Sequence, residues 1–128
     1  MLGQNYVDGK FVDSVSESEF DNLDPCTEES LATFKNTTNE EVDAAYECAR
    51  KTFHEWRAIS RVERAEYMYE VAKLIEERRE KLAGIISLET GKNYNESIAE
   101  VNEALHMAQY AFSSGRTPQG EAVASEIS

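Results

Sequence analysis

The apolar residues between Val42 and Phe112 recur every three or four positions, and this spacing constrains the fold more than any other feature of the sequence. It is the spacing of one face of an α-helix, which must pack against another apolar surface. Before position 38 the pattern differs, because short β-prone pairs alternate with turn residues. A chain of 128 residues has room for one domain and one core. We predict a single α+β segment, β-rich over residues 1–35 and helical over 38–115.

The β-rich part contains one strong hairpin signal. Asp8 and Gly9 separate two short β-prone stretches, and both residue types accept the positive φ that a tight hairpin turn requires. Two further strands are expected at 19–23, which the Asp-Pro pair at 24–25 stops, and at 30–35.

Capping boxes predict where the first two helices begin. Thr38 with Glu41 forms one box, and its helix should end near Arg57. Ser60 with Glu63 forms the second box. The apolar stripe that follows fits either one long helix or two helices joined near positions 78–79.

A glycine marks the next boundary. Gly91 is the expected C-cap, and the last helical face continues to Phe112 and ends at Gly115. Residues 117–128 contain a Pro and a Gly and could extend as a strand, although no partner strand follows them.

Charge and cysteine content limit the partners and the compartment. Thirteen basic against 25 acidic residues give a net charge of −12, which disfavours nucleic acid and anionic membrane surfaces as partners. Cys26 and Cys48 form no metal-binding or redox pair, so free thiols are expected, with Cys48 buried in a helix and Cys26 in a turn. The sequence shows no signal peptide and no long apolar run, so we predict a cytoplasmic protein.

Few residues suggest chemistry of their own. His54 and His106 have no carboxylate, serine or cysteine at a catalytic spacing, and the Thr-Gly-Lys at 90–92 lacks the glycines of a phosphate loop. Glu89 differs, because it lies in the last turn of a helix, where the helix dipole disfavours an anion. A lysine, a cation or a hydrogen-bond network could compensate it, or the side chain could simply be exposed.

Several short segments, in order along the chain, resemble the N-terminal portion of the aldehyde dehydrogenase superfamily. They are residues 6–12, 24–29, 42–45, 49–53 with 56–57, 64–67 with 72 and 74–78, 87–92, and Glu96 with 100–101 and 115–116. One departure is Glu28, which stands where the family usually has a turn glycine. A positive φ there would cost a glutamate more than a glycine.

The resemblance implies a role within a larger enzyme. The segment would be part of an α/β, Rossmann-like cofactor domain of an enzyme that oxidises an aldehyde or semialdehyde with NAD or NADP. The family's catalytic and dinucleotide-binding residues lie beyond the matching positions. No catalytic or cofactor-binding residue is therefore assigned here, no cofactor is expected on this segment, and the isolated chain is expected to be inactive.

The resemblance also implies a cation site and partners. A structural monovalent cation would be held by main-chain carbonyls at Asn22 and Leu23 and by the carboxylate of Glu89. The remainder of the enzyme, or a second copy, would cover the helices, and residues after Gly120 would begin a strand used in subunit association. Residues 120–121 and 125–127 resemble semialdehyde-oxidising members. The residues alone also allow another class of protein, a stand-alone helical interaction module capped by a β-hairpin.

Overall fold

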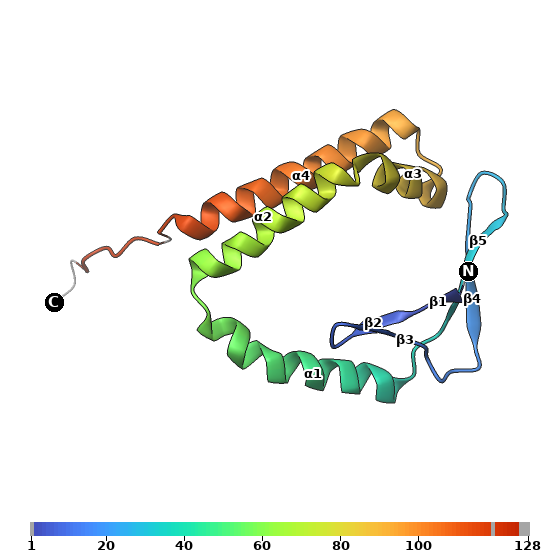
Figure 1. Ribbon diagram of the computed structural model, residues 1–128, viewed down its shortest axis with the longest axis horizontal. Coiled ribbons are helices and arrows are strands. Elements are labelled where there is room, and N and C mark those ends of the chain that lie inside the picture. The colour runs from blue at the N-terminus through green and yellow to red at the C-terminus, as the bar shows by residue number, and fades with distance from the viewer. Residues whose placement is uncertain (1, 119, 126–128) are drawn as a thin grey trace.

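The computed structural model describes residues 2–118 and 120–125. Short strands come first and helices follow, as predicted (Figure 1). The strands are β1 (Leu2–Gly3), β2 (Asn5–Val7), β3 (Lys10–Val12), β4 (Glu19–Leu23) and β5 (Ser30–Lys35). The helices are α1 (Asn39–Ala58), α2 (Arg61–Glu77), α3 (Arg79–Thr90) and α4 (Tyr94–Arg116). The α+β class is confirmed.

The predicted hairpin is β2–β3, with Asp8 and Gly9 at its tip. The strands pair antiparallel, with Val7 opposite Lys10, and both turn residues have positive φ, 53° and 72°. An aspartate tolerates this conformation better than most residues, and glycine adopts it without strain. The Tyr6 and Phe11 rings meet edge to face at 5.0 Å on the hairpin.

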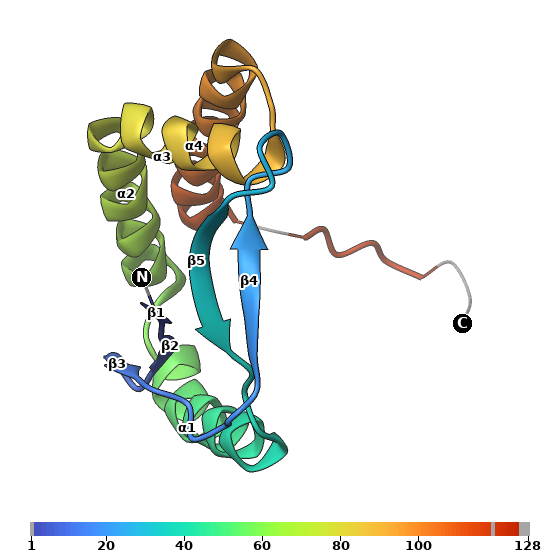
Figure 2. The same ribbon diagram turned by 90° about the vertical axis from the view of Figure 1, so that its right-hand side faces the viewer.

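A second sheet has the strand order β1-β5-β4. β4 and β5 pair antiparallel, and both lie where the sequence predicts them. β1 pairs parallel to β5 and was not predicted, because two residues carry no periodicity. Figure 2 shows that the β4–β5 hairpin runs from the side of α1 towards the end of α3.

The N-terminus of α1 is held by the predicted capping box. The Glu41 amide donates to Thr38 Oγ1, and the Thr38 amide donates to Glu41 Oε2 at 2.8 Å. Glu41 also accepts hydrogen bonds from the Ser14 hydroxyl and the Val15 amide. Together these bonds lower the pKa of Glu41 to about 2, the Thr38 amide contributing most. The loop after β3 is thereby joined to α1.

The core lies between the other three helices. α2 and α4 run antiparallel side by side, and α3 packs on α4 (Figure 1). Small residues dominate the buried positions, which lets the helix backbones approach closely. The buried residues of the three helices are Ala65, Ala72, Ala83, Ser97, Val101 and Ala108.

The structure resolves the choice between one long helix and two in favour of two. Helix geometry ends at Arg78, with φ −104° and ψ 11°, and α3 begins at Arg79. The Arg78 amide still donates a hydrogen bond to Leu74 O, so the last helical hydrogen bond of α2 is kept at the break. The change of direction allows α3 to pack on α4.

The tail after α4 carries no strand over residues 120–125, while Gln119 and residues 126–128 lie outside the described residues. The strand expected at 117–128 stays a prediction, because a strand needs a partner. Among the described residues, no helix is long and apolar enough to cross a membrane.

Candidate functional site

The candidate site begins where β4 ends. Asn22 pairs with Ala32, but Leu23 pairs with Ser30, so Leu31 is an extra residue on β5 and forms a bulge. A bulge interrupts the regular ladder and leaves main-chain groups outside it. The carbonyl segment that the resemblance assigns to a cation, Asn22 and Leu23, lies directly opposite this irregularity.

The turn that follows is organised by one aspartate. Asp24 Oδ1 accepts hydrogen bonds from the amides of Cys26 at 2.7 Å and Thr27 at 3.3 Å. The Glu28 amide donates to Asp24 O at 2.8 Å, and the Asp24 amide donates to Glu29 O at 2.9 Å. Glu28 has φ 62°, which is the left-handed conformation. The family usually has a glycine at this position, and the conformation costs a glutamate more than a glycine.

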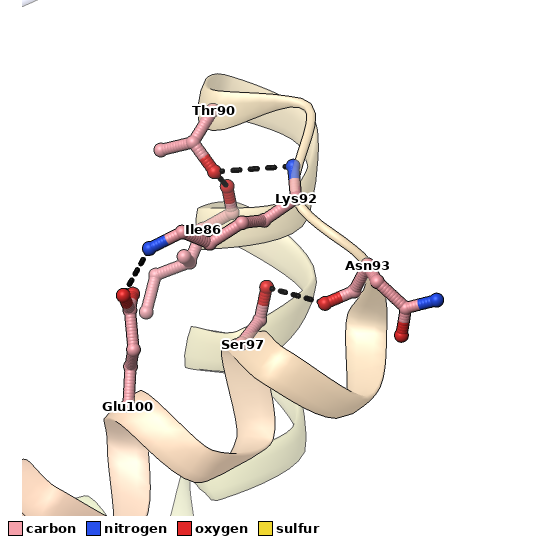
Figure 3. Close-up of polar contacts among 6 residues, drawn as sticks. All are labelled: Ile86, Thr90, Lys92, Asn93, Ser97 and Glu100. Carbon is pink, nitrogen blue, oxygen red and sulfur yellow. Dashed lines mark hydrogen bonds and ion pairs between the residues drawn. The ribbon is translucent and has the colours of Figure 1, made fainter.

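The other half of the site is the C-terminus of α3 (Figure 3). Gly91 is the predicted left-handed cap, with φ 68°, and its amide donates to Ser87 O. Thr90 Oγ1 donates to Ile86 O at 2.6 Å and accepts from the Lys92 amide at 3.3 Å. The turn into α4 is therefore closed by side chains as well as by the backbone.

Lys92 does not compensate Glu89. Its ammonium group forms an ion pair with Glu100 on α4, as Figure 3 shows. Glu89 itself is exposed, and within the described residues its carboxylate has no hydrogen bond or ion pair. Of the explanations that the sequence allowed for Glu89, a cation and simple exposure remain.

The structure brings the two halves together through Gly91. A Cβ atom at this position would lie 3.0 Å from Cys26 Sγ and 3.1 Å from Pro25 Cγ, so the turn packs directly on the glycine. Asn22 and Leu23 directly precede this turn, which begins at Asp24, and Glu89 precedes Gly91 by two residues. The sequence predicted Gly91 as a cap but gave no signal that a turn 65 residues earlier would touch it.

The donor set fits a monovalent cation better than a multivalent metal. In the described part of the chain, no three His, Cys, Asp or Glu side chains lie close enough to bind one metal ion. A site here would depend on neutral carbonyls and a single carboxylate, a hard-oxygen set of low total charge. The irregular end of β4 and the free carboxylate of Glu89 are compatible with it.

The remaining candidate residues lie apart from this site. His106 faces Glu103 on the surface of α4, and His54 lies next to Phe53 on α1. Cys26 is exposed and free, as expected. Cys48 is free but only half-buried, which corrects the expectation of a buried thiol, because Asp8 of the hairpin covers it only in part at 3.6 Å.

A surface groove of about 540 Å³ lies between the β2–β3 hairpin and α1. Its walls are largely apolar and include Tyr6, Val12, Val42 and Tyr46. Three charged residues also line it, Asp8, Lys10 and Glu41, of which Glu41 is engaged in the capping bonds and Asp8 accepts from the Cys48 thiol.

Comparison with known proteins identifies the family. The family model described as "Aldehyde dehydrogenase family" matches residues 11–128. The chain belongs to this family. It is 34% identical over 122 residues to malonate-semialdehyde dehydrogenase 1 of Oceanobacillus iheyensis, a match that covers 95% of this chain and 25% of the relative.

Other members agree with this assignment. The NADP-dependent glyceraldehyde-3-phosphate dehydrogenase of Streptococcus equinus is 34% identical over 118 residues, covering 92% of this chain and 24% of that protein. The crystal structure of a variant of betaine aldehyde dehydrogenase from Staphylococcus aureus, in complex with NAD+, superposes with a TM-score of 0.87 at 29% identity. That match covers 98% of this chain and 25% of the solved chain, so the chain spans about a quarter of its relatives' length.

Proposed function

We propose that this chain serves as the N-terminal segment of an NAD(P)-dependent aldehyde dehydrogenase, which oxidises an aldehyde or semialdehyde to a carboxylic acid. The observation that carries the proposal is the match to one quarter of such enzymes with the same fold, at a TM-score of 0.87. In this reaction class a cysteine attacks the aldehyde, and the nicotinamide cofactor accepts the hydride when it is bound. NAD and NADP both occur in the names of relatives and solved structures.

The thiols of this segment do not suit that role. Cys48 is half-buried, and its thiol is engaged with the carboxylate of Asp8 at 3.6 Å. Cys26 lies in the turn that packs on Gly91, and neither cysteine stands at a position that matches the family's nucleophile. We infer that the segment contributes structure to the enzyme and that the chain alone is inactive.

The test is to read the gene beyond position 128. We expect a reading frame, continuous or adjacent, that encodes the family's catalytic cysteine and dinucleotide-binding loops. The absence of such a frame near the gene, together with a stable and cooperative monomer, would instead favour the stand-alone interaction module.

For the site at Gly91, we propose that the main-chain carbonyls of Asn22 and Leu23 and the carboxylate of Glu89 hold a structural monovalent cation. The bulge opposite Leu23, the contact of the following turn with Gly91 and the unpaired carboxylate of Glu89 support it. The cation would also offset the unfavourable position of Glu89 at a helix C-terminus.

Thermal unfolding in sodium, potassium and choline chloride at equal ionic strength tests this site. The wild-type Tm should be higher in sodium or potassium than in choline. Glu89→Gln should remove the difference, while Glu55→Gln on the exposed surface of α1 should keep it. An equal difference in both variants, or none in the wild type, would contradict the cation site.

We further propose that the segment works in the cytoplasm and associates with the rest of its enzyme or with itself. Association is supported by the many large apolar side chains that remain exposed on the helices. Among them are Trp56, Tyr67, Leu74 and Met107. Sedimentation equilibrium should show dimers or larger species at micromolar concentration, weakened at low salt by the charge of −12. A monomer at all concentrations would contradict self-association.

A further inference from the structure

Packing does not fix the direction of α1. None of its residues is buried, and its apolar side chains are widely exposed, Val42 by 40% and Phe53 by 53%. In both views α1 lies apart from the α2–α4 pair (Figures 1 and 2). The helical pair, by contrast, buries residues from both helices, Ala65 and Ala72 of α2 and Ser97, Val101 and Ala108 of α4.

The β2–β3 hairpin is attached to α1 rather than to the helical pair. Cys48 Sγ lies 3.6 Å from Asp8 Oδ1 at the hairpin tip, and Asn5 and Thr37 exchange side-chain hydrogen bonds near its base. Glu41 binds the Val15 amide in the loop after β3. We call α1 and this hairpin together the arm.

Two extended residues connect the arm to α2. Ile59 has φ −70° and ψ 149°, and Ser60 has φ −62° and ψ 152°. Ser60 is the N-cap of α2, because its carbonyl accepts a hydrogen bond from the Arg64 amide and its hydroxyl accepts one from the Glu63 amide, both at 3.0 Å. A change of direction that keeps these bonds therefore falls on the backbone of Ile59, which belongs to neither helix.

One side chain spans the linker. Arg64 Nη1, on the first turn of α2, donates to Ile59 O at 2.7 Å and reaches the carbonyls of Trp56 at 3.4 Å and Arg57 at 3.5 Å. These carbonyls form the negative end of α1, where a cation is favoured. The rings of Trp56 on α1 and Tyr67 on α2 also meet across this junction, with their centroids 5.4 Å apart.

We propose that the backbone of Ile59 forms a hinge and that Arg64 is the latch that fixes the angle between the arm and α2. The Arg64 guanidinium links the last turn of α1 to the first turn of α2. Few other described contacts join these two helices. Outside the arm, the β4–β5 turn packs on Gly91 through Pro25 and Cys26, a van der Waals contact that involves no charged group. Loss of the latch leaves both helices folded but lets the arm change its angle.

The test measures a distance across the hinge in the full 128-residue chain. Spin labels replace Glu47 on α1 and Glu103 on α4, whose side chains are 62% and 77% exposed, in a Cys26→Ser, Cys48→Ser background. We expect one narrow distance distribution with Arg64 present. Arg64→Ala should broaden the distribution, and Arg64→Lys should broaden it less, because lysine keeps the charge but loses the fork.

A matched control and a second signal separate the latch from a general loss of fold. Arg50→Ala removes an exposed guanidinium from α1 and should leave the distribution narrow. Trp56 is the single tryptophan, so its fluorescence reports the hinge directly, and Arg64→Ala should increase its quenching by acrylamide at unchanged helical circular dichroism. An unchanged distribution and unchanged quenching in Arg64→Ala would overturn the proposal. If Arg64→Ala fails to fold, the same two readings on Arg64→Lys decide it.

Discussion

The Ser14 hydroxyl donates a hydrogen bond to Glu41 Oε2 at 2.7 Å and joins the loop after β3 to the first turn of α1. The same carboxylate accepts from the Thr38 and Val15 amides at 2.8 and 2.9 Å. Three donors to one carboxylate favour its ionised form, which explains the pKa of about 2.

This lowered pKa predicts how stability depends on pH. A carboxyl group with a pKa of about 2 in the folded state and 4.5 when unfolded stabilises the fold above pH 4.5. Its contribution is lost as the pH falls from 4.5 towards 2. Glu41→Gln should therefore lower the Tm at neutral pH, and the gap from wild type should close over this range. Thermal unfolding followed by circular dichroism at a series of pH values measures it.

The matched control is Glu40→Gln, which changes an exposed acid in the same helical turn. Its gap from wild type should be smaller and should depend less on pH. Equal pH profiles for the two variants would show that the hydrogen bonds of Glu41 do not stabilise the fold.

A second prediction concerns the left-handed residue in the β4–β5 turn. Glu28 has φ 62°, a conformation that costs a residue with a Cβ roughly 1–2 kcal/mol. A glycine avoids this strain, but it loses more backbone entropy on folding, which cancels part of the gain. Glu28→Gly should raise the free energy of unfolding by about 0.5–1 kcal/mol. Urea unfolding measures this, and Glu29→Gly, where φ is not positive, should be destabilising. A loss of stability in Glu28→Gly would contradict the strain argument.

Two glycines, Gly84 inside α3 and Gly91 at its C-cap, give a third, paired prediction. Gly91→Ala should lower the free energy of unfolding by about 1–3 kcal/mol, because its φ is 68° and its new methyl group would crowd Cys26 and Pro25. Gly84→Ala, inside the helix with open space around it, should raise it by about 0.5–1 kcal/mol. Similar effects in both variants would rule out the tight contact at Gly91.

Local signals made most of the elements predictable. The Asp8-Gly9 turn, the capping box at Thr38 and the cap at Gly91 each depend on residues within four positions of one another, and each lies where it was expected. Such signals survive because turn and cap chemistry is decided mainly by the local backbone.

The features that the sequence did not reveal depend on distant contacts. β1 exists because Leu2–Gly3 pairs with β5 thirty residues later. The sequence left open whether a break falls at 78–79, because no proline or glycine stands there, and the structure shows the break that allows α3 to pack on α4. The contact of Pro25 and Cys26 with Gly91, which assembles the candidate site, is of the same kind.

The central claim is that this chain can act as the N-terminal quarter of an aldehyde dehydrogenase, and a chimera tests it most directly. The chain replaces the matching quarter of the Staphylococcus aureus betaine aldehyde dehydrogenase, and the formation of reduced nicotinamide is measured with betaine aldehyde and NAD+. We predict activity in the chimera and none in this chain alone or in the truncated relative alone. A chimera that is soluble and folded by circular dichroism, yet inactive and unable to bind NAD+, would contradict the claim.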